Sequence, residues 1–418
     1  MTILLIISVV SLFSNIELIT PLVVLRPFDL LVGILFFYTI LRLRSHTTFI
    51  IPKGLYLFFP FIIWHVLSAF TLDMNNGIRE LLQSVVIVMF GYALYKFLVV
   101  ANEYDIKIFY KYVVYGFIVI CLYTIIWHVI NGYYVGWKRL GDTKYVFTFL
   151  PMIMGFVILF AKKRYGFLIS LWIILGIILL LSGERKSWLI YIVLSLTIFS
   201  KNNVRGALPF IMITALVIMT ASLYFADNYL MKKFNSIVSP SETVEFTVDD
   251  IRHGNVPESM SNAQRVFAVG VGLELFRSSP IIGVGTNGYA RIVKEEYGHF
   301  PRFLTIGIHN EFFRVIVENG AIGLILFVLL WVYSVKRSSK VLSGNLIGNS
   351  KFRKHRKRVM VLVFSPLLIS IFFEASGSQA MIIILVVSLM PEIFRLLMLH
   401  TVSNTHLYRT QQSQTRPC

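Results

Sequence analysis

Long apolar runs separated by short polar stretches dominate the sequence. A helix that crosses a membrane needs about 20 apolar residues, or fewer where charged side chains at its ends reach the interface. Met1–Ser14 lacks the basic start and the small-residue cleavage site of a signal peptide, so we expect the first run to remain a helix. The pattern predicts about twelve spanning helices, over residues 2–22, 28–41, 54–71, 80–100, 112–131, 145–161, 165–182, 187–200, 205–226, 312–335, 359–375 and 379–399.

One long polar segment interrupts these runs and divides the chain. We predict an N-terminal transmembrane bundle (1–226), a large external loop (227–311), C-terminal transmembrane helices (312–400) and a cytoplasmic tail (401–418). Within the loop, short helices are expected over Val266–Arg277 and Tyr289–Tyr297, joined by a glycine-rich turn. The predicted fold is therefore an all-α, polytopic membrane helix bundle with one large loop that carries short helices.

Composition supports a membrane protein and explains the net charge. Hydrophobic residues make up 56% of the chain and charged residues 14%, against about 45–50% and 25% in soluble domains. The net charge of +18 follows the positive-inside rule if both termini are cytoplasmic and the long loop is external. The basic run Lys351–Arg358 is then an anchor at anionic lipid. Nucleic acid is not an expected partner.

The helix that follows the external loop carries charges at its start. Ala321–Val335 supplies 15 mostly apolar residues, about 22 Å of helix against a hydrocarbon core of about 30 Å. The helix must begin earlier, which draws Glu311, Arg314 and Glu318 into or near the membrane, on one helix face. Charges there are costly unless they face the protein interior or a wet cavity. An ion-paired stripe that orients the helix and a functional group both fit this pattern.

His309 stands at the outer end of this helix. An imidazole has an ordinary pKa near 6.5 and can accept a proton at neutral pH, although many such histidines only cap a helix or form a hydrogen bond. Gly320 and Gly323 follow on the same helix. Small residues let helices approach closely in lipid, so we expect these glycines to act in packing and to position His309 indirectly.

The loop sequence from Gly283 to Gly288 matches the pattern G-x-G-x-x-G. A dinucleotide site needs that pattern between a strand and a helix, with an acidic residue about 20 positions further on. A loop between membrane helices does not supply the sheet, so we reject this interpretation. Two alternatives remain: a glycine turn with left-handed dihedral angles, and a nest of backbone N–H groups that contacts a phosphate.

Basic residues also gather on the predicted external side. Arg185 and Lys186 lie at an external helix junction, against the positive-inside pattern, and so do Lys138 and Arg139. The external loop adds Arg265, Arg277, Arg291 and Arg302. Guanidinium groups bind phosphate in a bidentate manner, so the natural partner of this face is a lipid phosphate or diphosphate.

Three motifs together resemble the O-antigen ligase and polymerase family of bacterial envelope glycan assembly. They are His309-Asn310 with Gly320 and Gly323 after nine intervening residues, Ser279-Pro-Ile-Ile-Gly-Val-Gly-Thr-Asn287 behind Arg265, and the junction Ser182–Trp188. Arg26–Asp29 and Gly77–Glu80 also look like the family. The resemblance spans the chain in architecture, with strong motifs over about residues 180–190 and 262–335.

The resemblance implies a GT-C-type glycosyltransferase in the bacterial inner membrane that uses an undecaprenyl-diphosphate-linked oligosaccharide donor at the periplasmic face, without metal or other cofactor. His309 would be the general base, and Arg185 and Arg265 would hold the donor diphosphate. Supporting roles fall to Lys186, Asn310, Glu311, Arg314 and Glu318. The chain departs from the family at Glu184, where a serine or threonine is common, which changes the electrostatics beside Arg185.

The acceptor separates two activities within this interpretation. A polymerase joins repeat units, together with a possible chain-length regulator, whereas a ligase transfers the finished glycan to lipid A–core. We favour a polymerase slightly, because the loop and the re-entering helix resemble exopolysaccharide-type members. A different class, a transporter or flippase of lipid-linked sugars, would carry its charges near the midplane between repeated halves. This sequence shows no such repeat and concentrates its polar residues in one loop.

Overall fold

The computed structural model describes residues 1–11, 18–19, 24–43, 53–102, 143–160, 165–181, 185–199, 260–298, 307–343, 350–373 and 380–396, with short pieces between 104 and 126. Two short strands pair antiparallel within this part of the chain, β1 (Leu18–Ile19) and β2 (Val24–Leu25). The named helices are α1 (Thr2–Ser11), α2 (Pro27–Leu43), α3 (Leu55–Phe70), α4 (Met74–Val100), α6 (Thr143–Phe160), α7 (Tyr165–Leu181), α8 (Arg185–Phe199), α12 (Met260–Ser278), α13 (Gly288–Glu296), α14 (Glu311–Ser343) and α15 (Ser350–Phe373). Residues 380–396 form a further helix. The all-α prediction is confirmed for these residues apart from the strand pair.

Several predicted spans coincide with helices of the structure. The spans over 54–71, 145–161, 165–182 and 187–200 correspond to α3, α6, α7 and α8, with ends that differ by at most 2 residues. The predicted loop helices are present as α12 and α13. The spans over 112–131 and 205–226, residues 227–259 of the external loop and the tail 401–418 lie largely or wholly outside the described residues.

The first predicted span is wrong in its second half. Helix α1 ends at Ser11, and β1 lies where the pattern predicts helix up to residue 22. The polar stretch Ser14–Glu17 interrupts the apolar run, and Pro21 disfavours helical backbone at its own position and at the residue before it. Apolar content alone therefore overestimated the length of this helix.

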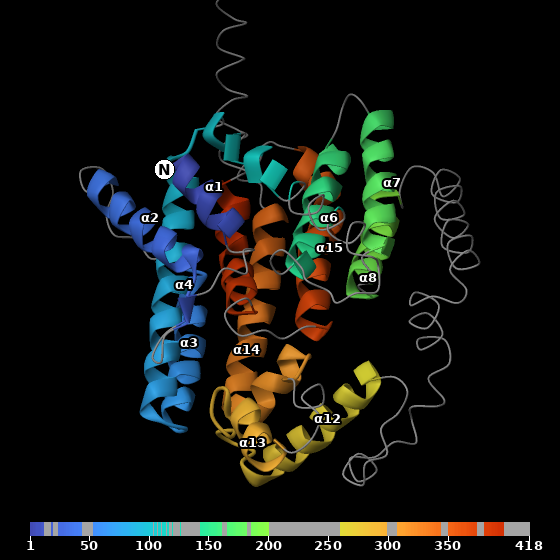
Figure 1. Ribbon diagram of the computed structural model, residues 1–418. Helices are drawn as coiled ribbons and strands as arrows, with labels where there is room; N and C mark the ends of the chain where they lie inside the picture. Colours follow the sequence, from blue (N-terminus) through green and yellow to red (C-terminus); the bar gives the residue numbers. More distant parts are fainter. Residues whose placement is uncertain are drawn as a thin grey trace, which may run out of the picture.

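The helices form an upright bundle, and α12 and α13 lie across one end of it (Figure 1). Helices α3 and α4 pack together as a hairpin, and α14 packs against α3 on one side and α15 on the other. Helix α15 also contacts α6 and α8. We call α12, α13 and the loop between them (residues 279–287, the insertion loop) the cap.

The cap has a small apolar core of its own. Its members come from α12, α13, the residues just before α14 and α14 itself: Phe267, Ala268, Val271, Tyr289, Val293, Ile308 and Val317. Burial raises the pKa of the Tyr289 phenol within this core. The first turns of α14 therefore pack both with the cap and, through Phe312 and Val315, with the core of the bundle, to which the rest of α14 belongs.

The surface of the bundle is apolar where lipid is expected. Among the described helices, α4 and α14 are long and apolar enough to cross a membrane, judged by length and composition. One face of α14 exposes Ile325 (57%), Val328 (40%), Leu329 (50%) and Val332 (42%). Spacings of three and four residues form a continuous stripe along a helix, which suits contact with lipid chains.

Spin labels should report this stripe directly. A label introduced at Ile325 or Leu329 in proteoliposomes should collide frequently with oxygen and rarely with a water-soluble nickel chelate, because oxygen concentrates in hydrocarbon. A label at Glu296, on the cap, should show the opposite ratio. Power-saturation measurements compare the two relaxation agents, and a ratio at Leu329 equal to that at Glu296 would contradict a lipid-facing stripe.

Candidate functional site

The site is built around a break in α14. Gly320 has φ 66° and ψ −168° within an otherwise helical segment, a combination that is almost restricted to glycine. A Cβ atom at Gly320 would collide with the carbonyl group of Ile281 in the insertion loop. At Gly323 it would collide with the Cβ of Asn319 and lie 3.4 Å from the Trp64 ring. Gly320 therefore admits loop backbone beside the helix, in addition to the packing role expected of both glycines.

The insertion loop replaces the helical hydrogen bonds that the break removes. In an unbroken helix the N–H groups of residues 321 and 322 would bond to the carbonyls of residues 317 and 318. Four bonds to the loop stand in their place: Val284 N to Val317 O (3.0 Å), Gly285 N to Glu318 O (2.9 Å), Ala321 N to Pro280 O (2.9 Å) and Ile322 N to Ile281 O (3.3 Å). The loop thus donates two backbone hydrogen bonds to α14 and accepts two from it.

The glycines of the insertion loop allow the turn that places its backbone against α14. Gly283 and Gly285 have φ of 78° and 92°, so the left-handed turn predicted from the sequence is confirmed. A phosphate nest would need free N–H groups, but those of Gly283 and Gly288 bond to Ser279 O (3.0 Å) and Gly285 O (2.8 Å). Those of residues 284 and 285 are bonded to α14. The alternative of a phosphate nest over residues 283–285 is therefore wrong.

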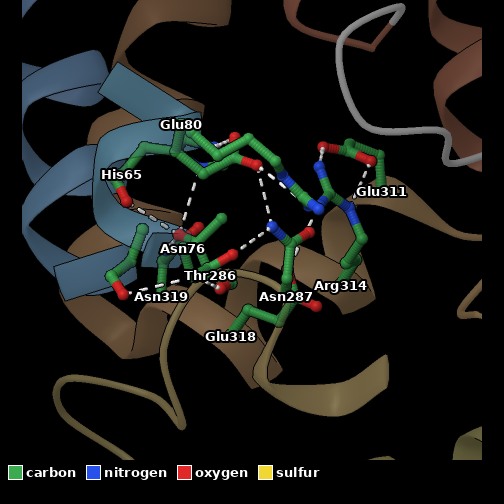
Figure 2. A network of polar contacts seen from close by, with 11 residues as sticks. His65, Asn76, Glu80, Thr286, Asn287, Glu311, Arg314, Glu318 and Asn319 are labelled. Carbon is green, nitrogen blue, oxygen red and sulfur yellow. Dashed lines mark hydrogen bonds and ion pairs between the residues drawn. The ribbon is translucent and has the colours of Figure 1, made fainter. Parts of the chain in front are cut away.

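The insertion loop is also held by the α3–α4 hairpin (Figure 2). The Asn287 side-chain amide donates to Glu80 Oε1 (2.8 Å) and to Asn76 Oδ1 (3.0 Å). Asn76 in turn donates to the backbone oxygen of Thr286 (2.7 Å). Asn287 adopts the left-handed conformation, with φ 66°, at the N-cap of α13. Two adjacent loop residues therefore carry most of the contacts to α4.

A second chain of hydrogen bonds connects α3, the loop and α14. The Thr286 hydroxyl donates to the His65 carbonyl (2.8 Å) and accepts from the side chain of Asn319 (2.8 Å). His65 Nε2 lies 3.3 Å from Glu80 Oε2. His65, Thr286 and Asn319 are 3%, 0% and 1% exposed. Such a buried network fixes relative positions, because an unpaired member would cost its full desolvation energy.

The charged face of α14 is paired internally. Arg314 donates from Nε to Glu311 Oε2 (2.9 Å), from a terminal nitrogen to Glu311 Oε1, and from the other to Glu318 Oε2 (3.1 Å). Glu311 is 0% exposed and Glu318 is 3% exposed. The side chains face inward, as the cost of charges near a membrane requires. All three guanidinium nitrogens are engaged, so Arg314 acts on the helix itself in this arrangement.

His309 lies immediately before the first turn of α14. Asn310 caps that turn, since its side-chain oxygen accepts from Phe313 N (3.0 Å) and its carbonyl accepts from Arg314 N (2.8 Å). Ile308, on the other side of His309, is buried in the cap core. His309 itself is half-buried. Its backbone is thus fixed from both sides while its side chain keeps some access to solvent.

The basic candidates occupy two other helices. Arg265 is exposed on the first half of α12, and Lys186 is 4% exposed near the start of α8. The backbone of Arg185 begins α8, whose start lies at the end of the bundle nearer to α12 (Figure 1). The side chain of Arg185 lies outside the described residues, as do Lys138, Arg139, Glu184 and Arg302.

Sequence reasoning missed His65, Asn76 and Asn319 of the network, and it noted Glu80 only as the last residue of the motif Gly77–Glu80. One signal could have pointed to both His65 and Glu80. His65 lies inside an apolar run and Glu80 at the edge of another, and polar side chains in spans are costly unless they are paired. Among the described residues, no group of three or more His, Cys, Asp or Glu side chains could hold a metal ion.

Comparison with known proteins finds a match to one protein family. Residues 169–328 match a family model described as O-antigen ligase. These residues are similar to the O-antigen ligase family. The resemblance inferred from the motifs is thereby confirmed, and the family indicates a membrane glycosyltransferase of the ligase or polymerase type. The O-antigen ligase match contains α8, the cap, His309 and the break at Gly320, whereas α3 and α4 lie outside it. No curated protein matches the chain.

Substitution of Gly320 by alanine should destabilise the protein. The strained dihedral angles alone cost about 1–3 kcal/mol, and the collision with Ile281 adds to that. We expect a clear fall in the melting temperature of the purified protein in detergent. Gly33→Ala is the matched control, since Gly33 lies within α2 with no atom within 4 Å of an added Cβ, and alanine there should raise helix stability slightly. Equal melting temperatures for both variants would contradict the requirement for glycine.

Proposed function

We propose that the protein transfers an undecaprenyl-diphosphate-linked glycan to a sugar hydroxyl at the periplasmic face of the bacterial inner membrane. In this proposal the cap lies on the periplasmic side, the chain crosses the membrane about twelve times, and both termini are cytoplasmic. The observation that carries it is the position of His309, half-buried directly before the N-cap of α14, inside the matched family region.

His309 acts as the general base in the proposed reaction. An imidazole nitrogen takes the proton of the acceptor hydroxyl, the hydroxyl oxygen bonds to the anomeric carbon of the donor, and the bond from that carbon to the diphosphate breaks. The diphosphate leaves with the electron pair. Arg265 and Arg185 balance its charge, and Lys186 supports them. A diphosphate neutralised in this way is a good leaving group, so the proposal needs neither a metal nor a general acid.

The exposed face of α12 supports a donor with a lipid tail. Arg265, Val269 and Leu273 follow one another at spacings of four residues, and all three are exposed. Side chains at that spacing share one helix face. A guanidinium group beside two aliphatic side chains is chemically complementary to a diphosphate attached to a polyprenyl chain.

Within this proposal we favour the polymerase, with a glycan acceptor and a possible chain-length regulator as partner. The basis is the resemblance of the loop and the re-entering helix to exopolysaccharide-type members. The alternative is ligase activity, with lipid A–core as acceptor.

Substitution of the proposed base should abolish transfer. His309→Ala in a purified assay with a synthetic lipid-linked donor should lower kcat by about 10²- to 10⁴-fold, because general base catalysis contributes that much. Arg265→Ala should reduce kcat/KM for the donor by about 10²-fold, since the charge of the leaving diphosphate loses one partner.

Arg277→Ala is the matched control for Arg265, since Arg277 is an exposed arginine at the other end of the same helix. It should retain most of the activity. Normal turnover by both His309→Ala and Arg265→Ala would refute the catalytic assignment. An equal loss in Arg277→Ala would show that the overall charge of α12 matters, not a specific contact of Arg265.

A deletion strain should distinguish polymerase from ligase. Without a polymerase, lipid A–core should carry single repeat units, because ligation continues. Without a ligase, long glycans should accumulate on undecaprenyl diphosphate. Gel analysis of lipopolysaccharide together with mass spectrometry of lipid-linked glycans checks both. Accumulation of long lipid-linked chains would overturn our preference for the polymerase.

A further inference from the structure

We propose that the α3–α4 hairpin, through His65, Asn76 and Glu80, positions His309 for catalysis. These residues lie outside the family match and do not adjoin His309 in the sequence. The proposal rests on the general-base role of His309 and assigns the three side chains an indirect part in the same reaction.

The first step is the hydrogen bonding between the hairpin and the insertion loop. Glu80 and Asn76 bind the side chain of Asn287, and the His65 carbonyl binds the Thr286 hydroxyl. The pair of His65 with Glu80 (3.3 Å) links the two helices of the hairpin. Thr286 and Asn287 are therefore held by α3 and α4 together.

The second step is the hydrogen bonding of the loop and of α3 to the backbone of α14 at the break. The break leaves the carbonyls of residues 317 and 318 without their helical donors. The loop donates to both. Helix α3 adds Ser68 Oγ to Glu318 O (3.1 Å) and Trp64 Nε1 to Asn319 O (2.9 Å). The hairpin thus contacts the break both directly and through the loop.

The third step carries this constraint to His309. The segment from Glu311 to Asn319 is one stiff piece, because Arg314 bonds to Glu311 and Glu318 along its inner face. Its nine residues extend about 13 Å at 1.5 Å per residue. A tilt of about 5° at the break would shift the start of the helix by about 1 Å, and a shift of 1 Å can cost about 10²-fold in rate.

A reversal of donor and acceptor between positions 287 and 80 tests the proposal. Asn287→Asp removes the amide donor and places a carboxylate beside Glu80, whereas Glu80→Gln removes the charged acceptor. We expect each single variant to lower kcat on the order of tenfold or more, with KM for the donor unchanged. In the double variant the amide at position 80 donates to the carboxylate at position 287, so kcat should recover to within about threefold of the unmodified protein.

Two further readouts separate positioning from general stability and from direct catalysis. Melting temperatures of all variants are measured, and Glu296→Gln, an exposed carboxylate on α13, serves as control. The pH profile of kcat/KM should keep its acidic limb in each single variant, because the base itself is unchanged. A double variant no faster than the product of the two single effects, at similar melting temperatures, would overturn the proposal. Loss of the acidic limb in Glu80→Gln would do the same.

A distance measurement keeps this test independent of the proposed function. Spin labels at Gly307 and Lys340, in a protein whose two cysteines are replaced, report the angle across the break. Asn287→Asp should broaden or shift their distance distribution, and the double variant should restore it. An unchanged distribution in Asn287→Asp would overturn the coupling, whatever the activity of His309→Ala. Full turnover by His309→Ala would refute the general base and leave the coupling supported by the distances alone.

Discussion

The exchange of backbone hydrogen bonds at Gly320 is the interaction on which the rest of the site depends. A buried carbonyl group left unpaired costs about 1–3 kcal/mol, so a break in a buried helix requires donors from elsewhere in the protein. The insertion loop and α3 supply them. The same loop also accepts the helix N–H groups beyond the break, through Pro280 O and Ile281 O. Displacement of the loop would therefore leave both the carbonyl and the N–H groups of the break unpaired. Loop, break and helix start therefore form one structural unit.

The break divides α14 into a short charged segment and a longer apolar one. Beyond the break α14 continues to Ser343, about 34 Å from Ala321 at 1.5 Å per residue. Its last turns carry Lys336, Arg337 and Lys340, so its apolar part remains shorter than a hydrocarbon core of about 30 Å. The segment with Glu311, Arg314 and Glu318 is therefore still expected at or near the membrane boundary, where its internal ion pairs offset the cost of its charges.

Local patterns in the sequence identified several of the helices predicted as spans, the two cap helices and the inward charged face, because each depends on spacing within one helix. The partners of the insertion loop could not be identified in this way. Thr286 and Asn287 bind residues that are 221 and 207 positions away, and periodicity carries no information over such separations. Gly320 was ambiguous for a related reason: close helix packing and positive φ both require glycine, and only the loop backbone beside it distinguishes them.

The spacing of the histidine motif follows from helix geometry. Nine residues separate Asn310 from Gly320, which is two and a half helical turns at about 3.6 residues per turn. One residue more or fewer would rotate the start of the helix by about 100°. The Glu311–Arg314 pair would then leave the interior, and His309 would face another direction relative to the cap. Asn310 caps the N-terminal end of the segment, and Gly320 and Gly323 determine the backbone geometry and packing at its C-terminal end. Three of the four motif residues thus set the direction in which the fourth, His309, points.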